Sequence, residues 1–413
     1  MEFKKTKFDI GIMEKTLEQK RHLNSWVKNG GIGSCIAATG LGKTRIGLMA
    51  IEHVFKKLED NVLTSKGRYE RNALIIVPNE NLRDNEWPNE FAKWKMKSYL
   101  DDVEIMCIHS AYKLEENHYD IVVVDEAHTT LSGEYGKFYD NNCWDNLMCL
   151  TATPPENAEY RKFLKEIAPV VCHTDLKAAV KMGLVSPYTI YNIGVTFTPA
   201  EKAEYDRVDN LFKLCTAKLG GQWQAFTNAT KWRSSSDKEK AKWANMFYVM
   251  MQKRKKLCYN ASNKLLVTDQ ILRKFVDRKA LVFSESIDFA QRLQDRLGDE
   301  CVTFHSKMSK KEREETLKRF GDNRTKARVI SSVKALNQGL NVPECSLGIC
   351  AAGSSMKLDN IQRTGRTLRL QEGKISLYIN LFVKGSQEVK WVRKRCKNDP
   401  NVHWVDSLDD VIV

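Results

Sequence analysis

Apolar and polar positions follow one another along the 413-residue chain in a pattern that predicts strands separated by helices. The apolar runs are short and uninterrupted, which is typical of strands buried on both faces of a sheet. In the first part of the chain they fall at residues 32–38, 73–77, 103–108, 121–124 and 149–151. Between the first two runs, apolar residues at helical spacing predict an amphipathic helix over 43–58. This alternation favours a parallel sheet with helical crossovers.

The pattern returns in the second half of the chain and predicts another α/β domain of similar size. Its expected strands are residues 280–284, 302–304, 329–331, 347–351 and 376–381. Helical spacing lies between them, as at 287–297 and 310–319. The last residues predict a basic helix over 390–395 and a short strand near 402–405.

Residues 201–260 break the alternation and predict a basic helical insertion. This segment follows a β-rich run at 188–197, and a loop is expected within it at 233–237. It contains 13 Lys and Arg against 6 Asp and Glu, a net charge of +7. Its three tryptophans are Trp223, Trp232 and Trp243. Two interpretations are weighed equally: the tryptophans form a small helical core, or the insertion is a strand-separating wedge or a grip on phosphates.

Composition narrows the class of protein. The chain carries 66 Lys and Arg against 52 Asp and Glu, so its net charge is +14, and 42% of its residues are hydrophobic. These values indicate a globular protein with a polyanionic partner, either nucleic acid or an anionic membrane surface. No apolar run is long enough to span a bilayer, and we expect no secretory signal. The eleven cysteines include no Cys-x-x-Cys pair, which disfavours a zinc site and favours reduced thiols.

The segment 37–44, Ala-Ala-Thr-Gly-Leu-Gly-Lys-Thr, predicts a phosphate-binding loop. It departs from the usual pattern because Ala37 stands where the first glycine is normally found. The loop follows a predicted strand and opens a predicted helix, so backbone N–H groups can face a phosphate. Lys43 can reach the β- and γ-phosphates, and the Thr44 hydroxyl can ligate Mg²⁺. The competing interpretation is an ordinary glycine-rich turn.

The predicted strand 121–124 ends in Asp125 and Glu126, and His128 follows shortly after. Two adjacent carboxylates at the end of an apolar strand are unfavourable unless they have a cation or a proton-transfer task. We expect Asp125 to hold Mg²⁺, Glu126 to act as general base on a water, and His128 to couple the site to a neighbouring element. The structural alternative is a polar strand end that caps the next helix.

A cluster of three arginines lies within residues 362–369 of the second predicted domain. Alone it is typical of a solvated helix face. Phosphoryl transfer, however, needs cations where negative charge develops on the γ-phosphate. We therefore expect the cluster and the phosphate loop to meet across a cleft when ATP binds.

These segments occur in the order found in superfamily 2 helicases, which the chain resembles over most of its length. Segment 37–44 resembles motif I, and Asp125–His128 matches the DEAH box of motif II. Further matches are 77–82 (Ia), 109–112 (Ib), 150–154 (III), 281–284 (IV), 304–306 after it, 331–343 (V) and 362–369 (VI). The segments 183–188 and 198–205 are similar to the link between the motor domains of XPB-like and phage UvsW-like DNA helicases.

The resemblance implies an α/β fold with two tandem RecA-like domains, each a parallel sheet with flanking helices, and a helical insertion between them. We expect the first domain at 1–180, a linker and the basic helical insertion at 181–260, the second domain at 261–385, and a tail at 386–413.

The resemblance also implies roles for the matching residues. The ATP-binding residues would be Gln19, Thr39, Gly40, Gly42, Lys43, Thr44, Gly339 and Asn341, with Gln19 reading adenine. The catalytic residues would be Lys43, Asp125, Glu126, Gln362, Arg366 and Arg369. Mg²⁺ would be held by Thr44 and Asp125. The nucleic-acid backbone would follow Pro78, Asn79, Ser110, Ser284, His305, Ser332 and Lys334. Hydrolysis would be coupled to that path by His128, Thr151 and Thr153.

The implied function is an ATP-dependent DNA helicase that couples MgATP hydrolysis to translocation and to unwinding or branch migration. The alternatives are a duplex translocase that does not separate strands, an RNA-dependent ATPase, and a nucleic-acid-binding module with an inactive motor. We expect a monomer that binds single-stranded, duplex or branched DNA, with RNA as the alternative partner and no membrane association. Its expected location is the cytoplasm, that of the host if phage-encoded, or the nucleus. Neutralising Lys253, Arg254, Lys255 and Lys256 is expected to weaken DNA binding and flatten its salt dependence.

Overall fold

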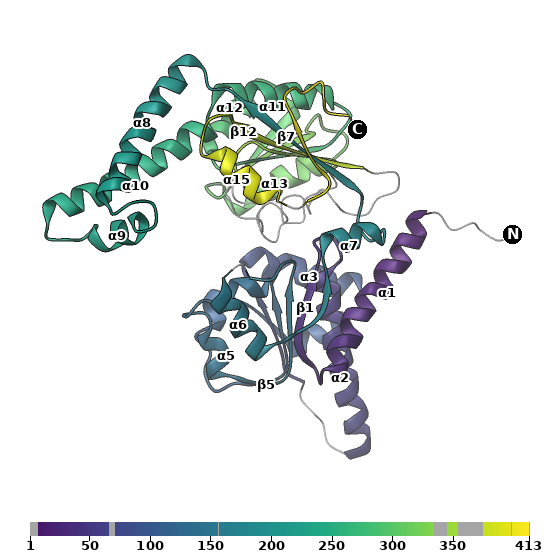
Figure 1. The fold of residues 1–413 in the computed structure, drawn as a ribbon. Helices are drawn as coiled ribbons and strands as arrows, with labels where there is room; N and C mark the ends of the chain where they lie inside the picture. The colour runs from purple at the N-terminus through teal and green to yellow at the C-terminus, as the bar shows by residue number, and fades with distance from the viewer. Residues whose placement is uncertain are drawn as a thin grey trace. The chain divides into compact units, whose positions relative to one another are not determined.

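The computed structural model describes residues 7–65, 71–155, 157–333, 345–353, 375–397 and 399–412. The chain forms two compact units with a boundary between Pro187 and Tyr188. Each unit contains one sheet of mainly buried strands with helices around it (Figure 1). The prediction of two tandem RecA-like domains is therefore confirmed.

The first sheet has six strands in the order β3-β2-β4-β5-β1-β6, and every neighbouring pair is parallel. The strands are β1 (Ile32–Ala37), β2 (Ala73–Val77), β3 (Val103–Cys107), β4 (His118–Asp125), β5 (Cys143–Thr151) and β6 (Val170–Thr174). The main helices around it are α1 (Lys7–Lys28), α2 (Lys43–Ser65), α3 (Trp87–Lys93), α4 (Ile108–Ala111), α5 (Lys137–Asn141), α6 (Ala158–Ile167) and α7 (Leu176–Lys181). Short helical turns add Leu82–Glu86, Lys97–Asp102 and Ala127–Thr129.

Strand order and register bring two loops of this domain together. Strand β5 lies between β1 and β4. Ile36 of β1 is level with Thr151 of β5, and Asp125 of β4 is level with Leu150. The three strands therefore end at the same edge, where open parallel sheets bind their ligands.

The second sheet has the order β13-β7-β12-β11-β8-β10-β9. Its strands are β7 (Tyr188–Val195), β8 (Ala280–Ser284), β9 (Cys301–His305), β10 (Val329–Val333), β11 (Leu347–Cys350), β12 (Ser376–Val383) and β13 (Val402–Val405). The helices beside it are α11 (Ser262–Lys274), α12 (Ile287–Leu297), α13 (Lys310–Gly321) and α15 (Glu388–Arg395), with a short turn at Gly298–Glu300. Residues 188–260, treated above as linker and insertion, lie in this second unit, and β7 is part of its sheet.

Three helices form an arm that extends away from the second sheet (Figure 1). They are α8 (Pro199–Lys218), α9 (Ala225–Trp232) and α10 (Lys238–Tyr259). Thr198 starts α8 with a capping box to Glu201, and Asp237 caps α10 by accepting from two backbone N–H groups. The expected loop at 233–237 is thus confirmed. None of the helices described is long and apolar enough to cross a bilayer.

The arm has its own small core, which separates the roles of its three tryptophans. Trp232 and Trp243 pack against buried residues that include Phe247. Trp223, in contrast, is 93% exposed, and the neighbouring Phe226 is 61% exposed. The core interpretation therefore holds for two tryptophans, while Trp223 remains accessible to a partner.

Arg254 is not one of the arm's free surface cations. Its guanidinium on α10 is 2.6 Å from a carboxylate oxygen of Asp209 on α8 and lies 4.2 Å from the ring centroid of Phe212. Only 13% of its side chain is exposed. The charge of Arg254 therefore joins the two long helices of the arm, and the expected effect of residues 253–256 on DNA binding stays a prediction.

We predict that Arg254→Gln will destabilise the arm by about 1–2 kcal/mol, because a largely buried ion pair and a cation–π contact are lost together. Asp209 keeps its ion pair with Lys213, at 2.8 Å, which limits the loss. Lys253→Gln, at an exposed position on the same helix, is the control and should change stability by less than about 0.5 kcal/mol. Hydrogen exchange of α8 and α10 measures both, and equal protection in the two variants would contradict the structural role.

Candidate functional site

The loop after β1 has the geometry of a phosphate cradle. Gly40 and Gly42 have φ angles of 91° and 90°, in the left-handed region that favours glycine. Helix α2 begins directly afterwards at Lys43, so its N-terminus and the first N–H groups face the loop. The loop start is held to the sheet because the Ala38 N–H donates to the Thr174 carbonyl at 2.9 Å.

The two carboxylates at the end of β4 lie beside this loop. Lys43 Nζ is 3.1 Å from Glu126 Oε1, and both side chains are mostly buried. Glu126 has φ 49° and ψ 49°, a left-handed conformation that is unfavourable for a residue with a side chain. Backbone strain of this kind is typical of functional sites, where surrounding contacts hold it in place.

Electrostatics at the site are dominated by burial. Asp125 is 4% exposed, and burial raises the pKa of its carboxyl group to about 6, with the charge of Glu126 adding to the effect. Lys43 opposes this rise, as do hydrogen bonds from the Trp87 indole and the Glu126 backbone N–H. A cation brought to the site would favour the ionised carboxylate still further.

The three residues expected to couple hydrolysis to movement are in contact. His128 Nδ1 lies 3.0 Å from Thr151 Oγ1 and 3.5 Å from Glu126 Oε2. The Thr151 hydroxyl donates to the Thr153 carbonyl at 2.8 Å. A continuous polar chain thus leads from the carboxylate pair to the segment after β5.

Gln19 lies at the phosphate loop, but its amide group is already bonded. Its Nε2 donates to the Leu41 carbonyl at 2.6 Å, and its Oε1 accepts from Arg45 at 2.9 Å. A Cβ at Gly42 would lie 2.6 Å from Gln19 Nε2, so this glycine also leaves room for the glutamine. In this structure Gln19 supports the loop, and adenine reading would require its contacts to rearrange.

The donor set fits a magnesium-bound nucleoside triphosphate. The cradle offers a cation at Lys43, a hydroxyl at Thr44 and the carboxylate of Asp125, which suit a phosphate and a hard, oxygen-preferring metal ion. The Thr39 hydroxyl oxygen is buried and has no hydrogen-bond partner among the described residues. A buried hydroxyl without a partner in a phosphate cradle is the kind of group that a bound phosphate satisfies, because a phosphate oxygen can accept its hydrogen bond.

Comparison with known proteins places one family match in each domain. Residues 12–156 match the family described as "Type III restriction enzyme, res subunit", and residues 263–371 match "Helicase conserved C-terminal domain". The protein named "DNA 3'-5' translocase XPB2" of Sulfurisphaera tokodaii is 24% identical over 395 residues, which cover 91% of this chain and 83% of that protein. The two family matches and this relative support a helicase of superfamily 2.

Two further relatives of this helicase match over shorter segments. "DEAD-box ATP-dependent RNA helicase 22" of Oryza sativa subsp. japonica is 28% identical over 28% of this chain and 20% of its own length. "ATP-dependent DNA helicase fml1" of Schizosaccharomyces pombe is 30% identical over 24% of this chain and 11% of its own length. Of these three relatives, the XPB2 translocase is the one whose match extends over both domains.

In the first domain of the helicase, the predicted nucleic-acid residues follow the ends of two neighbouring strands, with Ser110 inside the short helix α4. Val77 of β2 is level with Cys107 of β3, so Pro78, Asn79 and Ser110 all follow the same edge of the sheet. Asn79 Oδ1 accepts from the Leu82 N–H at 3.1 Å and fixes the turn after β2. These short side chains lie where backbone contact is feasible.

In the second domain, Ser284 and His305 end strands that flank β10, and both are level with Val333. Ser284 and Ser332 are buried, and the Ser284 hydroxyl donates to the Ser286 carbonyl. Their predicted contact with nucleic acid therefore has no exposed surface in this structure, whereas His305 is only half-buried. The remaining predicted residues, Lys334, Gly339, Asn341, Gln362, Arg366 and Arg369, lie outside the described residues.

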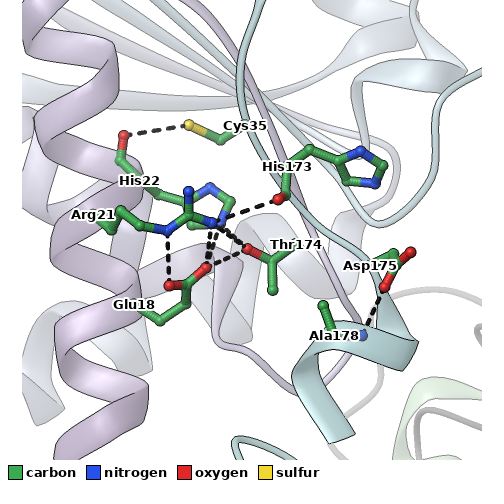
Figure 2. A network of polar contacts seen from close by, with 8 residues as sticks. All are labelled: Glu18, Arg21, His22, Cys35, His173, Thr174, Asp175 and Ala178. Atoms are coloured by element: carbon green, nitrogen blue, oxygen red, sulfur yellow. Dashed lines mark hydrogen bonds and ion pairs between the residues drawn. The ribbon is translucent and has the colours of Figure 1, made fainter. Parts of the chain in front are cut away.

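Sequence reasoning missed a polar network behind the phosphate loop (Figure 2). Thr174, at the end of β6, hydrogen-bonds through its hydroxyl to Glu18, to Arg21 at 2.9 Å and to His22 at 2.8 Å, all from α1. The Thr174 carbonyl in turn accepts from the loop residue Ala38. The network therefore fixes the base of the loop to helix α1. Polar residues at helical spacing carry no hydrophobic periodicity, which is why the pattern gave no signal for this helix.

We predict that His22 makes the helicase less stable as the pH falls. Burial lowers the pKa of His22 to about 4, although Glu18 favours the charged form and Arg21 and His173 oppose it. The unfolded state, with a pKa near 6.5, binds more protons between pH 6.5 and 4, so stability is lost as the pH falls through that window. The loss reaches roughly 3 kcal/mol.

The measurement is urea unfolding at steps from pH 7 to pH 4.5, in wild type and His22→Gln. The variant should lose less stability over this range, whatever its stability at pH 7. His118→Gln, at an exposed histidine of the same domain, is the control and should follow the wild-type slope. Parallel curves for wild type and His22→Gln would show that His22 does not titrate as expected.

Proposed function

We propose that this helicase is an ATP-dependent DNA translocase that uses MgATP hydrolysis to move along DNA and to separate or remodel its strands. The observation that carries the proposal is the contact between Lys43 and Glu126, 3.1 Å apart at the shared edge of β1 and β4. The choice of DNA is supported by the extended similarity to a protein named as a DNA translocase.

In the proposed hydrolysis, separate groups bind the phosphates, hold the metal ion and activate the water. Lys43 and the loop N–H groups hold the phosphates, and Thr44 and Asp125 hold the metal ion, which when bound would neutralise charge on the β- and γ-phosphates. Glu126 accepts a proton from the attacking water. The contact with Lys43 orients Glu126 until a phosphate takes over the lysine. His128, Thr151 and Thr153 then transmit the altered contacts of Glu126.

The proposed nucleic-acid path is sequence-independent. Pro78, Asn79 and Ser110 are small side chains that follow the ends of β2 and β3, and the imidazole of His305 ends β9; such positions suit backbone contact. The arm adds positive charge at Lys253, Lys255 and Lys256 and an exposed ring at Trp223 that can stack on an unpaired base. A duplex translocase that does not separate strands is the second candidate, because the long-range relative is named for translocation.

We predict that Glu126→Gln will lower the ATPase rate by about 10²-fold or more, because an amide cannot accept the proton of the attacking water. ATP affinity should stay within about threefold, since the amide occupies the same volume and the phosphate-binding groups remain. Steady-state ATPase and equilibrium binding of a fluorescent ATP analogue measure the two effects.

The control is Glu116→Gln, because Glu116 is exposed and has a similar left-handed φ of 58° in the same domain. It should leave the ATPase rate unchanged. Rates are compared with single-stranded, duplex, forked and four-way DNA and their RNA equivalents at fixed salt. Normal hydrolysis by Glu126→Gln would refute the assigned mechanism, stimulation by RNA alone would refute DNA as the substrate, and ATPase without displacement of a forked strand would favour the second candidate.

We predict that Lys253, Lys255 and Lys256, changed together to Gln, will weaken DNA binding and reduce its salt dependence. Each lost phosphate contact lowers the slope of log K against log salt by about 0.9 for duplex DNA. The matched control changes Lys28, Lys56 and Lys57 to Gln, because these exposed lysines lie at the end of α1 and in the second half of α2, away from the N-terminus of α2 at the phosphate loop. If the slope of log K against log salt were equal in the two triple variants, the lysines of the arm would contribute to DNA binding no more than other surface lysines do.

A further inference from the structure

Trp87, the first residue of α3, directs its indole N–H at the candidate metal-binding carboxylate. Its side chain is fully buried, and Nε1 donates to Asp125 Oδ2 at 3.2 Å. A buried indole N–H needs an acceptor, but many backbone carbonyls would serve. Here the acceptor is the carboxylate assigned to Mg²⁺, 38 residues further along the chain.

The second oxygen of the same carboxylate is also fixed. Asp125 Oδ1 accepts from the Glu126 backbone N–H at 2.9 Å. A carboxylate has about four lone-pair sites, so one donor at each oxygen leaves acceptor capacity on both. Two donors, one from α3 and one from the backbone after β4, therefore set the plane of the carboxylate without saturating it.

Helix α2 is shaped to admit the indole. A Cβ at Gly47 would lie 2.8 Å from Trp87 Cη2, 3.1 Å from Leu150 Cδ1 and 3.1 Å from Val123 Cγ1. Glycine inside a helix is less favourable than alanine, so its presence here needs a packing reason. The indole thus reaches from Asp125 at the end of β4 to Gly47 of α2, the helix that begins with Lys43.

A second tryptophan shows what a purely structural indole does in the same domain. Trp26 is also fully buried, and its Nε1 donates to the Leu147 carbonyl at 2.9 Å. Its acceptor is a backbone group within β5, four residues before the end of that strand. Trp26 and Trp87 are both buried, and the indole N–H of each has an acceptor. They differ because only the acceptor of Trp87, the Asp125 carboxylate, belongs to the candidate site.

We infer that Trp87 is a positioning residue for Asp125: its N–H holds the carboxylate in the orientation that receives the metal ion of MgATP. The inference rests on the proposed function. Hydrogen-bond partners of metal ligands contribute to affinity because they fix the direction of the ligand lone pairs, and their loss commonly lowers metal affinity or activity by 10- to 100-fold.

The test uses Trp87→Phe, which keeps an aromatic ring and removes the donor. The affinity for a fluorescent ADP analogue is measured with Mg²⁺ and with EDTA, and the ratio of the two gives the gain due to the metal ion. Trp87→Phe should reduce this gain by about tenfold and leave the affinity in EDTA unchanged. It should also raise the Mg²⁺ concentration that half-saturates the ATPase.

Trp26→Phe is the matched control, because it removes a buried indole N–H that does not reach the site. It should lower thermal stability and leave the gain from Mg²⁺ unchanged. If Trp87→Phe folds poorly, β-(3-benzothienyl)alanine at position 87 keeps the shape of the ring system without the N–H and should show the same loss of gain.

The possible results separate the inference from the proposed function. An unchanged gain in both position-87 variants, with the gain lost in Asp125→Asn, would overturn the role of Trp87 and leave MgATP binding intact. If Mg²⁺ does not tighten nucleotide binding even in the wild type, the proposed function itself fails. A reduced gain at position 87 with a normal gain in Trp26→Phe supports the inference.

Discussion

Two buried carboxylates at the end of β4 are the constraint on which the first domain depends. Asp125 and Glu126 cannot remain charged in an apolar sheet unless neighbouring groups compensate the loss of hydration. The compensation comes from Lys43 after β1, from the indole of Trp87 on α3 and from His128 in the next turn. The strand order makes this feasible, because only β5 separates the two strand ends. The strand order that forms the sheet therefore also brings together the charged groups of the site.

The phosphate loop also depends on neighbouring groups that hold it in place. The phosphate loop can only curl around an anion if its base is held, and the hydrogen bond from Ala38 to Thr174 provides this. Thr174 is held by three polar side chains of α1, and Gln19 of the same helix holds the loop backbone at Leu41. Helix α1 therefore acts as a rigid support for the loop.

The sequence predicted the sheets well because their strands are buried on both faces and form unbroken apolar runs. Strands β2 and β8 were predicted to the residue, as was helix α12. Helix α1 and strand β6 were missed, because α1 buries Glu18, Gln19 and His22 and β6 alternates exposed and buried positions over only five residues. Buried polar residues hide the helical period of α1, and five residues are too few for the alternation of β6 to stand out. The motif residues of the first domain were found because phosphate and metal chemistry restricts their types, and the structure brings Lys43, Asp125, Glu126 and His128 together.

Residues that orient charged groups are harder to find, since their types are not restricted in the same way. The donor to Asp125 needs only an N–H in the right place, and an indole, an amide or a hydroxyl would each supply one. Arg254 shows the same difficulty from the other side. Its place in a basic run suggests contact with phosphates, whereas its ion pair and ring contact join two helices of the arm. The role of a charged residue can therefore be assigned only when the group that it contacts is known. In the first domain the partners of Lys43 and Asp125 lie within the candidate site, whereas on the arm the partner of Arg254 is Asp209. This difference in partners separates a charge of the candidate site from one that joins two helices.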